Sequence, residues 1–272
     1  MVAYLFPLYA TEETVSLNQP TPLTTLLFYL RTFYGALAVL IPALIALTTG
    51  LILWALTRNK RKALNCMTLL LGWIGSAASG LRLTIENASI LQQHRPAVFV
   101  FNHQSGIDPI ILCRLLRRDV IGIAKIELKS HPVIGPLLAF GDTIFIDRQD
   151  KSSKRKLMDS ASNTLSGTLS IAIAPEGTRT KNTHSDSCMS VGSFKSGAFR
   201  LARESSRPIV PIIIFNSGRI LRPNRLDIKP GHVQIKILPA IYPDDWQKES
   251  PEEMALKLQT TYDSQLKEYA SR

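Results

Sequence analysis

Cysteine is scarce in this chain, and its three residues, Cys66, Cys113 and Cys188, stand far apart. An odd number of cysteines without metal-ligand spacing fits neither a disulfide framework nor a structural zinc site, and it favours a reducing compartment. The sequence also has no zinc-finger, leucine-zipper or RNA-recognition pattern, no internal repeat and no low-complexity linker. Nucleic acid is therefore not an expected partner.

Acidic residues are outnumbered by basic ones, 21 to 32, which gives a formal net charge of +11 and a pI near 9.7. Hydrophobic residues nevertheless make up 45% of the chain. A chain that is both basic and apolar suits an anionic membrane surface better than nucleic acid, because acidic lipids attract polybasic segments near a bilayer. The 272 residues suffice for one sizeable domain plus an appendage.

Residues 1–32 are expected to form a loosely ordered or interfacial lead-in. Prolines are scattered there among apolar and hydroxyl residues, and residues 1–30 carry only Glu12 and Glu13 as charges. This stretch lacks the basic start and the cleavage site of a secretory signal peptide, so we do not expect one.

Residues 33–82 are expected to form membrane-anchoring helices. Residues 33–56 carry no charge and are long enough to cross a hydrocarbon core of about 30 Å. Pro42 is a candidate kink within this segment. Interfacial aromatic residues stand near its ends, and a basic cluster follows at once: Tyr34, Trp54, Arg58, Lys60, Arg61 and Lys62. A buried core helix is the alternative for this segment.

A second uncharged segment, residues 64–81, contains several glycines and serines, so it is either a second span or a helix lying in the membrane interface. Two full spans would put the remaining domain outside the cell, whereas a single span would put it in the cytoplasm. A reduced, basic domain favours the cytoplasm. A shallow two-helix anchor that never crosses the bilayer would serve equally.

Residues 83–272 alternate between predicted strands and helices. This alternation predicts an α/β domain whose mostly parallel central sheet is flanked by helices. A last helix with its apolar residues at helical spacing is expected to be an ordinary packing element. The expected strands are 81–86, 97–101, 120–124, 143–147, 169–174, 208–215 and 233–238, and the expected helices are 109–117, 132–139, 151–165, 194–204 and 251–269.

Polar residues follow the apolar run 97–101 directly, beginning Asn102, His103 and reaching Asp108. Pro109 then predicts the first turn of a helix. An aspartate there can reach back to the histidine, fix its tautomer and favour the imidazolium that forms when the ring takes a proton, so the pair is a candidate general base. A partly buried loop histidine beside an ordinary helix cap is the alternative.

Three other predicted strands also run into chemically distinctive residues. Residues 144–148 end in Asp147 and Arg148, and residues 174–179 include a glycine turn followed by Arg179. Pro211 interrupts a further strand, which predicts that this strand lies at a sheet edge or carries a bulge. Convergence of these strand ends would place a general base beside an anion pocket, because guanidinium groups bind phosphate bidentately.

The order NHQSGID, FIDR, PEGTR and IVPI behind an apolar N-terminal segment resembles the glycerolipid acyltransferase family, and most closely its 1-acylglycerol-3-phosphate acyltransferases. The similarity covers about residues 85–240 and includes the phrases KIEL at residue 125 and FKSGAF at residue 194. It implies the glycerol-3-phosphate acyltransferase-like fold and a place in phospholipid biosynthesis at a bacterial inner membrane or an equivalent one. The implied reaction moves a fatty acyl group from acyl-CoA or acyl-carrier protein to lysophosphatidate, giving phosphatidate.

The resemblance also implies roles for individual residues. His103 would deprotonate the acceptor hydroxyl, and Asp108 would orient it. The implied substrate-binding residues are Lys125, Arg148, Glu176, Gly177, Thr178 and Arg179. No metal or cofactor is implied, because a thioester is activated enough to need only a base, an oriented hydroxyl and an oxyanion site. Ala174 stands where many relatives have a bulky residue, which leaves acyl and acceptor preference open.

Three alternatives stay open at the level of sequence. The acceptor could be another lysolipid or glycerol 3-phosphate. The protein could instead be a lipid or thioester hydrolase, although it lacks a G-x-S-x-G nucleophile elbow. It could also bind anionic membranes without catalysing a reaction.

Overall fold

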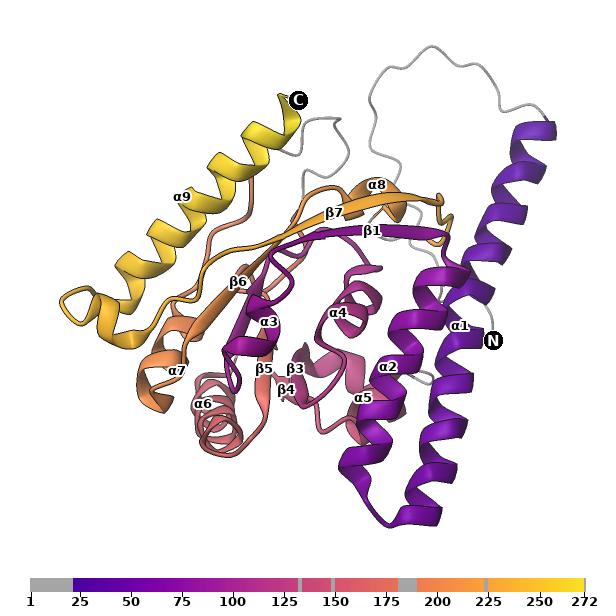
Figure 1. Cartoon of the computed structure of the whole chain (residues 1–272). Helices are drawn as coiled ribbons and strands as arrows, with labels where there is room; N and C mark the ends of the chain where they lie inside the picture. Colours follow the sequence, from indigo (N-terminus) through magenta and orange to yellow (C-terminus); the bar gives the residue numbers. More distant parts are fainter. Residues whose placement is uncertain (1–21, 132–133, 148–149, 181–189, 223–224, 272) are drawn as a thin grey trace.

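The computed structural model describes residues 22–131, 134–147, 150–180, 190–222 and 225–271. A seven-stranded sheet forms its centre, in the order β1-β7-β6-β2-β5-β3-β4, with helices on both faces (Figure 1). Neighbouring strands run parallel except β6 and β7, which are antiparallel. This confirms the predicted α/β fold with its mostly parallel sheet. The strands are β1 (Leu81–Glu86), β2 (Val98–Phe101), β3 (Val120–Lys125), β4 (Ile144–Ile146), β5 (Ser170–Ile173), β6 (Ile209–Ile214) and β7 (Gly231–Ile237).

The helices include every one predicted, with ends shifted by a few residues, together with short ones that the sequence pattern did not reveal. Between β1 and β7 a helix lies in every connection between consecutive strands, as parallel pairing commonly requires. The helical elements are α1 (Pro22–Thr57), α2 (Lys60–Ala78), α3 (Ile90–Gln93), α4 (Asp108–Leu116), η1 (Ile126–Ser130), α5 (Ile134–Phe140), α6 (Lys151–Ser166), α7 (Gly197–Ser205), α8 (Ser217–Ile220), η2 (Pro243–Trp246) and α9 (Pro251–Ala270).

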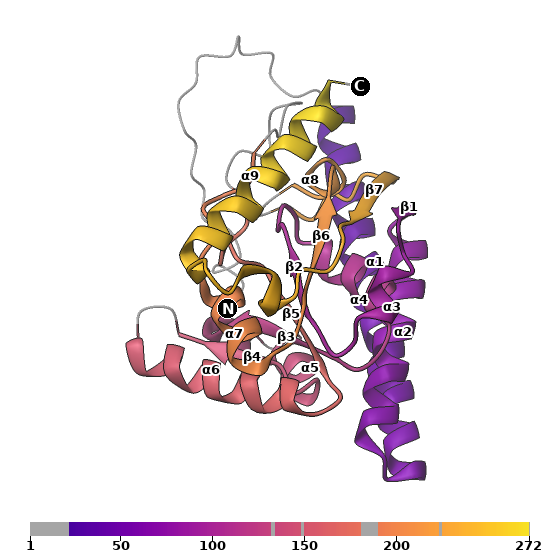
Figure 2. The same ribbon diagram turned by 60° about the vertical axis from the view of Figure 1, so that its left-hand side comes forward.

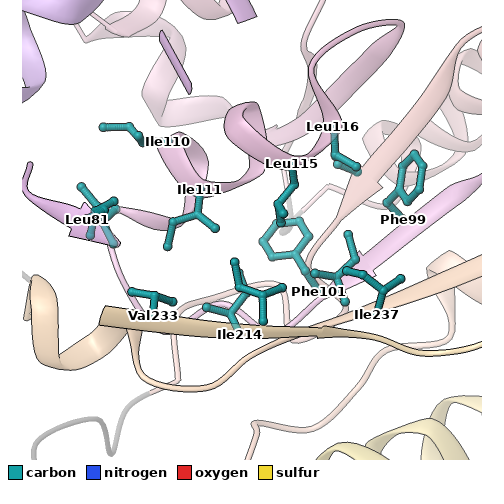
Figure 3. Close-up of a cluster of buried hydrophobic side chains, with 14 of the residues drawn as sticks. Leu81, Phe99, Phe101, Ile110, Ile111, Leu115, Leu116, Ile214, Val233 and Ile237 are labelled. Carbon is teal, nitrogen blue, oxygen red and sulfur yellow. The ribbon is translucent and has the colours of Figure 1, made fainter. Parts of the chain in front are cut away.

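Strand β2 lies between two hydrophobic layers, one on each face of the sheet, and contributes side chains to both. Its side chains alternate between the faces of the sheet: Phe99 and Phe101 join the layer under α4 (Figure 3), whereas Val98 and Val100 join the layer under α6, α7 and α9. All four side chains are buried, so β2 reads as a continuous apolar run, as a strand covered on both faces does. The loop that leaves this strand therefore starts from a rigid part of the molecule.

Strand β6 is an interior strand, so the edge position offered for its proline is wrong. Pro211 pairs with Val100 of β2 on one side, while β7 covers the other. On the β7 side, Ile212 pairs with Ile237. Farther along, Ile209 of β6 pairs with Ile241. Between these two pairings β6 advances by three residues, whereas the chain that continues β7 advances by four. That extra residue is a bulge, and an interrupted ladder tolerates a residue that has no N–H to donate.

Helix α1 begins at Pro22, earlier than the helical segment predicted to start at residue 33. Proline is accepted in a first helical turn, and no further proline occurs before Pro42. Small residues of α1 face the protein, namely Gly35, Ala38, Ala46 and Gly50. Its large apolar side chains are exposed along the whole helix, among them Leu23, Phe33, Leu44 and Ile52.

Helices α1 and α2 lie side by side along one flank of the domain, on the opposite side of the sheet from α9 (Figures 1 and 2). A Cβ on Gly72 of α2 would lie 2.5 Å from the backbone nitrogen of Arg114 in α4, so α2 rests directly on the domain. Within the part of the chain that the structure describes, α1 alone is long and apolar enough to cross a membrane.

Candidate active site

The loop between β2 and α4 starts at Asn102, whose side chain is hydrogen-bonded to the neighbouring strand. The Asn102 side chain, fully buried, donates to the carbonyl of Ile214 and accepts from its N–H, both at 2.8 Å. These two bonds tie the end of β2 to the end of the neighbouring strand β6. The next residue, His103, is therefore held at the carboxyl edge of the sheet, where α/β proteins commonly bind their ligands.

His103 and Asp108 form a hydrogen-bonded pair, as their spacing predicts. The imidazole Nδ1 lies 2.7 Å from Asp108 Oδ2, and the carboxylate is fully buried while the histidine side chain is 24% exposed. The same oxygen accepts the backbone N–H groups of Gln104 at 2.9 Å and Ser105 at 2.8 Å. With Asp108 ionised, Nδ1 carries the proton and Nε2 keeps a lone pair for an incoming hydroxyl.

Glu176 fastens a second loop to the first. Its Oε1 accepts the His103 N–H at 3.0 Å, and its Oε2 accepts the Thr180 hydroxyl at 2.7 Å and the Gly192 N–H at 2.8 Å. The Thr180 N–H in turn donates to the carbonyl of His103 at 2.8 Å. Both backbone polar groups of His103 are therefore held by the loop that follows β5.

Burial is the largest influence on the pKa of the Glu176 carboxyl. Its side chain is buried, and this burial raises the pKa of the carboxyl, while the hydrogen bonds from His103, Thr180 and Gly192 favour the charged form. The resemblance implied that Glu176 binds substrate, yet both carboxylate oxygens point into the protein. In this structure Glu176 therefore holds the loop that carries His103.

Arg179 approaches the His103 loop from the same turn. Its Nη1 lies 4.0 Å from the position that a Cβ on Gly106 would take, which puts the guanidinium beside the start of α4. Gly177 has a φ of +71°, a conformation that glycine adopts at no steric cost. Thr178 between them is exposed.

Lys125, another predicted cation, pairs with a different residue. Lys125 ends β3 and forms an ion pair of 2.6 Å with Glu127, with half of its side chain exposed. Strand β5 separates β3 from β2 in the sheet. Arg148 lies outside the residues that the structure describes. Among the described residues, no cluster of three His, Cys, Asp or Glu side chains could hold a metal ion.

The structure adds residues that the sequence did not single out for this site. Thr180 and Gly192 both bind the Glu176 carboxylate, and Lys195 lies against Gly177. Lys195 belongs to the FKSGAF phrase, which signalled a resemblance without a role for any one side chain. Gly192 offered no signal, because only its backbone N–H takes part.

Comparison with known proteins agrees with this geometry. The Acyltransferase family model matches residues 82–215, from β1 to just beyond β6. An uncharacterized acyltransferase of Schizosaccharomyces pombe is 33% identical over 62% of this chain and 59% of its own length. The human 1-acyl-sn-glycerol-3-phosphate acyltransferase beta is 30% identical over 77% of this chain and 74% of its own length.

A solved structure shares the fold. The crystal structure of the 1-acyl-sn-glycerophosphate (LPA) acyltransferase PlsC from Thermotoga maritima matches with a TM-score of 0.74 at 21% identity, over 91% of this chain and 98% of that chain. The motifs, the sheet and the relatives agree. The chain belongs to the acyltransferase family that includes the 1-acyl-sn-glycerol-3-phosphate acyltransferases.

Proposed function

We propose that this protein is a membrane-bound O-acyltransferase that moves a fatty acyl group from acyl-CoA or acyl-carrier protein to the sn-2 hydroxyl of 1-acylglycerol 3-phosphate, giving phosphatidate. The observation that carries the proposal is the 2.7 Å contact between His103 Nδ1 and the buried Asp108 Oδ2, with Arg179 beside the same loop. The named activities of the human relative and of other relatives supply the substrate class.

His103 is the proposed general base. Its Nε2 takes the proton of the acceptor hydroxyl as the oxygen attacks the thioester carbonyl carbon. The carbon–sulfur bond of the resulting tetrahedral intermediate then breaks, and the imidazolium returns the proton to the departing thiolate. Asp108 stabilises the imidazolium between these two events. The chain needs no nucleophile of its own, because a thioester reacts directly with an oriented hydroxyl.

The developing oxyanion needs a hydrogen-bond donor near His103. The backbone N–H of Gly106 is our candidate, since it has no acceptor within the described part of the chain and the residue is exposed. Its neighbours Gln104 and Ser105 donate to Asp108 instead. Gly106 thus lies in the same loop as the proposed base and beside Arg179.

Arg179 is the proposed contact for the acceptor phosphate, since it lies beside the loop that carries the base. Lys125 and Arg148 remain further proposals for the same anion. Gly177 and Thr178 would shape the turn that presents Arg179. A phosphate held here would orient the sn-2 hydroxyl toward Nε2, which is how binding remote from the reacting atoms accelerates a reaction.

The proposed location is a membrane, with the catalytic domain on its cytoplasmic side. The large exposed apolar residues of α1 would contact lipid, and the basic residues around the turn to α2, Arg58, Lys60, Arg61 and Lys62, would lie at anionic headgroups. The division into a lead-in, an anchoring helix pair and an acyltransferase domain from residue 83 belongs to the same proposal.

Acyl transfer in detergent or membranes tests the function. Labelled acyl-CoA and acyl-carrier protein are offered with lysophosphatidate, other lysolipids and glycerol 3-phosphate, and wild type is compared with His103→Ala. His232→Ala is the matched control, because this histidine is exposed and, within the described part of the chain, its ring forms a hydrogen bond only with Thr84 of β1. Phosphatidate formed by wild type and the control, but not by His103→Ala, would support the proposal. Free fatty acid as the product would show instead that the protein is a hydrolase.

A further inference from the structure

The loop that precedes α7 places a lysine over the PEGTR turn. A Cβ on Gly177 would lie 3.0 Å from Lys195 Nζ and 3.5 Å from its Cε, so the lysine side chain crosses the face of that glycine. Gly177 directly follows Glu176, whose carboxylate accepts the His103 N–H. Lys195 therefore reaches the same edge of the sheet as the proposed base and Arg179.

Hydrogen bonds from three directions hold this loop. The Lys195 N–H donates to the carbonyl of Pro175 at 3.0 Å, and the Gly192 N–H donates to Glu176. Two side chains of α9 accept the loop's other amides: Asp263 accepts from Val191 at 2.8 Å and Gln259 accepts from Phe194 at 3.0 Å. Because the backbone on both sides of the lysine is bonded, its Cα is fixed and only the side chain must be ordered by a ligand.

The Lys195 ammonium lies beside Gly177, close to a carboxylate whose oxygens are already hydrogen-bonded. Among the described residues no carboxylate pairs with it, and both oxygens of the nearby Glu176 are already occupied. The side chain is exposed and lies over the turn that also carries Arg179. Lys195 and Arg179 are like charges near one turn, and an anion between or beside them would relieve their repulsion.

We infer that Lys195 is a phosphate-binding residue of the acyltransferase site. This inference rests on the proposed function and deepens it. An ammonium is a compact charge with three donors, which suits a phosphate oxygen approached from one side. The phosphate could belong to the acceptor's phosphomonoester or to the phosphates of the thioester carrier, and the chemistry that Lys195 offers is the same for both.

Equilibrium binding to the full-length, detergent-solubilised protein tests the inference, with lysophosphatidate and CoA as separate probes. Lys195→Ala is expected to weaken one of the two by about tenfold to a hundredfold, the usual loss for a hydrogen bond to a charged group. Lys195→Arg should recover most of that affinity. The probe without phosphate, monoacylglycerol or pantetheine, should bind wild type and Lys195→Ala equally.

The matched control is Lys267→Ala, an exposed lysine in the last turn of α9, which should leave the affinity for both probes unchanged. Thermal unfolding of each variant shows whether it is folded. Steady-state transfer then assigns the source, because the KM rises for the substrate that Lys195 contacts while kcat changes little.

Equal affinity of wild type and Lys195→Ala for both lysophosphatidate and CoA would overturn the inference. An equal loss for the phosphate-free probes would overturn it too, since the lysine would then act on the shape of the site. If wild type transfers no acyl group to any acceptor, the proposed function fails, while the binding measurements still decide whether Lys195 holds a phosphate.

Discussion

Replacing Asp108 by asparagine separates the charge of this residue from its hydrogen bonds. One oxygen, Oδ2, accepts from the His103 ring and from two backbone amides, whereas Oδ1 has no hydrogen-bond partner within the described structure. An asparagine oxygen can take the Oδ2 position, and its amide group can take the other. The variant is therefore expected to fold with the loop in place.

The loss in Asp108→Asn should fall on turnover. A carboxylate and an imidazolium whose charge centres are about 4 Å apart attract each other by about 4 kcal/mol at the effective dielectric constant that suits proteins, roughly 20. Because the imidazolium exists only while the hydroxyl proton is held, most of this energy belongs to the transition state. Since about 1.4 kcal/mol is tenfold in rate, kcat should fall by two to three orders of magnitude.

Single-turnover and steady-state transfer of labelled acyl groups would measure this effect, with thermal unfolding recorded on the same samples. Asp244→Asn is the matched control, because that carboxylate is exposed and, among the described residues, accepts a hydrogen bond only from the side chain of Gln247. A folded Asp108→Asn protein that keeps kcat within about threefold of wild type would refute the argument, since the buried carboxylate would then contribute nothing to the base.

Four further changes test other contacts. Arg179→Ala should raise the KM for lysophosphatidate about tenfold or more with a smaller effect on kcat, and an unchanged acceptor KM would remove its role. Gly177→Ala should lower both stability, by about 1–2 kcal/mol for its positive φ, and acceptor affinity. Tyr262→Phe removes a buried hydroxyl that lies 2.9 Å from the carbonyl of Val100, and should cost about 1–3 kcal/mol in urea unfolding without changing kcat. Burial raises the pKa of Glu176, so wild-type stability should decline as the pH rises from about 4.5 through that raised pKa, a decline that Glu176→Gln should lack.

Helix α9 shows what a sequence pattern predicts and what it does not. Its apolar spacing predicted a packing helix, and Met254, Leu258, Tyr262 and Leu266 are indeed buried beneath the sheet. The polar residues Gln259 and Asp263 on the same helix accept amides of the loop that carries Lys195. Periodicity identifies which face of a helix is buried, but it does not say which distant amides its polar residues meet.

Pro211 illustrates a second limit. A proline within a strand restricts the hydrogen bonds that the strand can make, and the sequence alone could place it either at an edge or at a bulge. Only the pairing on both sides of β6 shows that the strand is interior and that the register shifts by one residue beside it. Strand order depends on which segments meet, and nothing local to residues 209–214 contains that information.

The sequence by itself determined the alternation of strands and helices, the apolar N-terminal segment and the histidine–aspartate pair. Each depends on residues close together in the chain, where side-chain period, charge and helix capping act directly. The tertiary structure decided which strand ends meet, that Glu176 turns inward to hold His103, and that Lys195 lies over Gly177. These contacts join loops far apart in the chain, so they arise only when the sheet assembles and brings the carboxyl ends of β2 and β5 side by side.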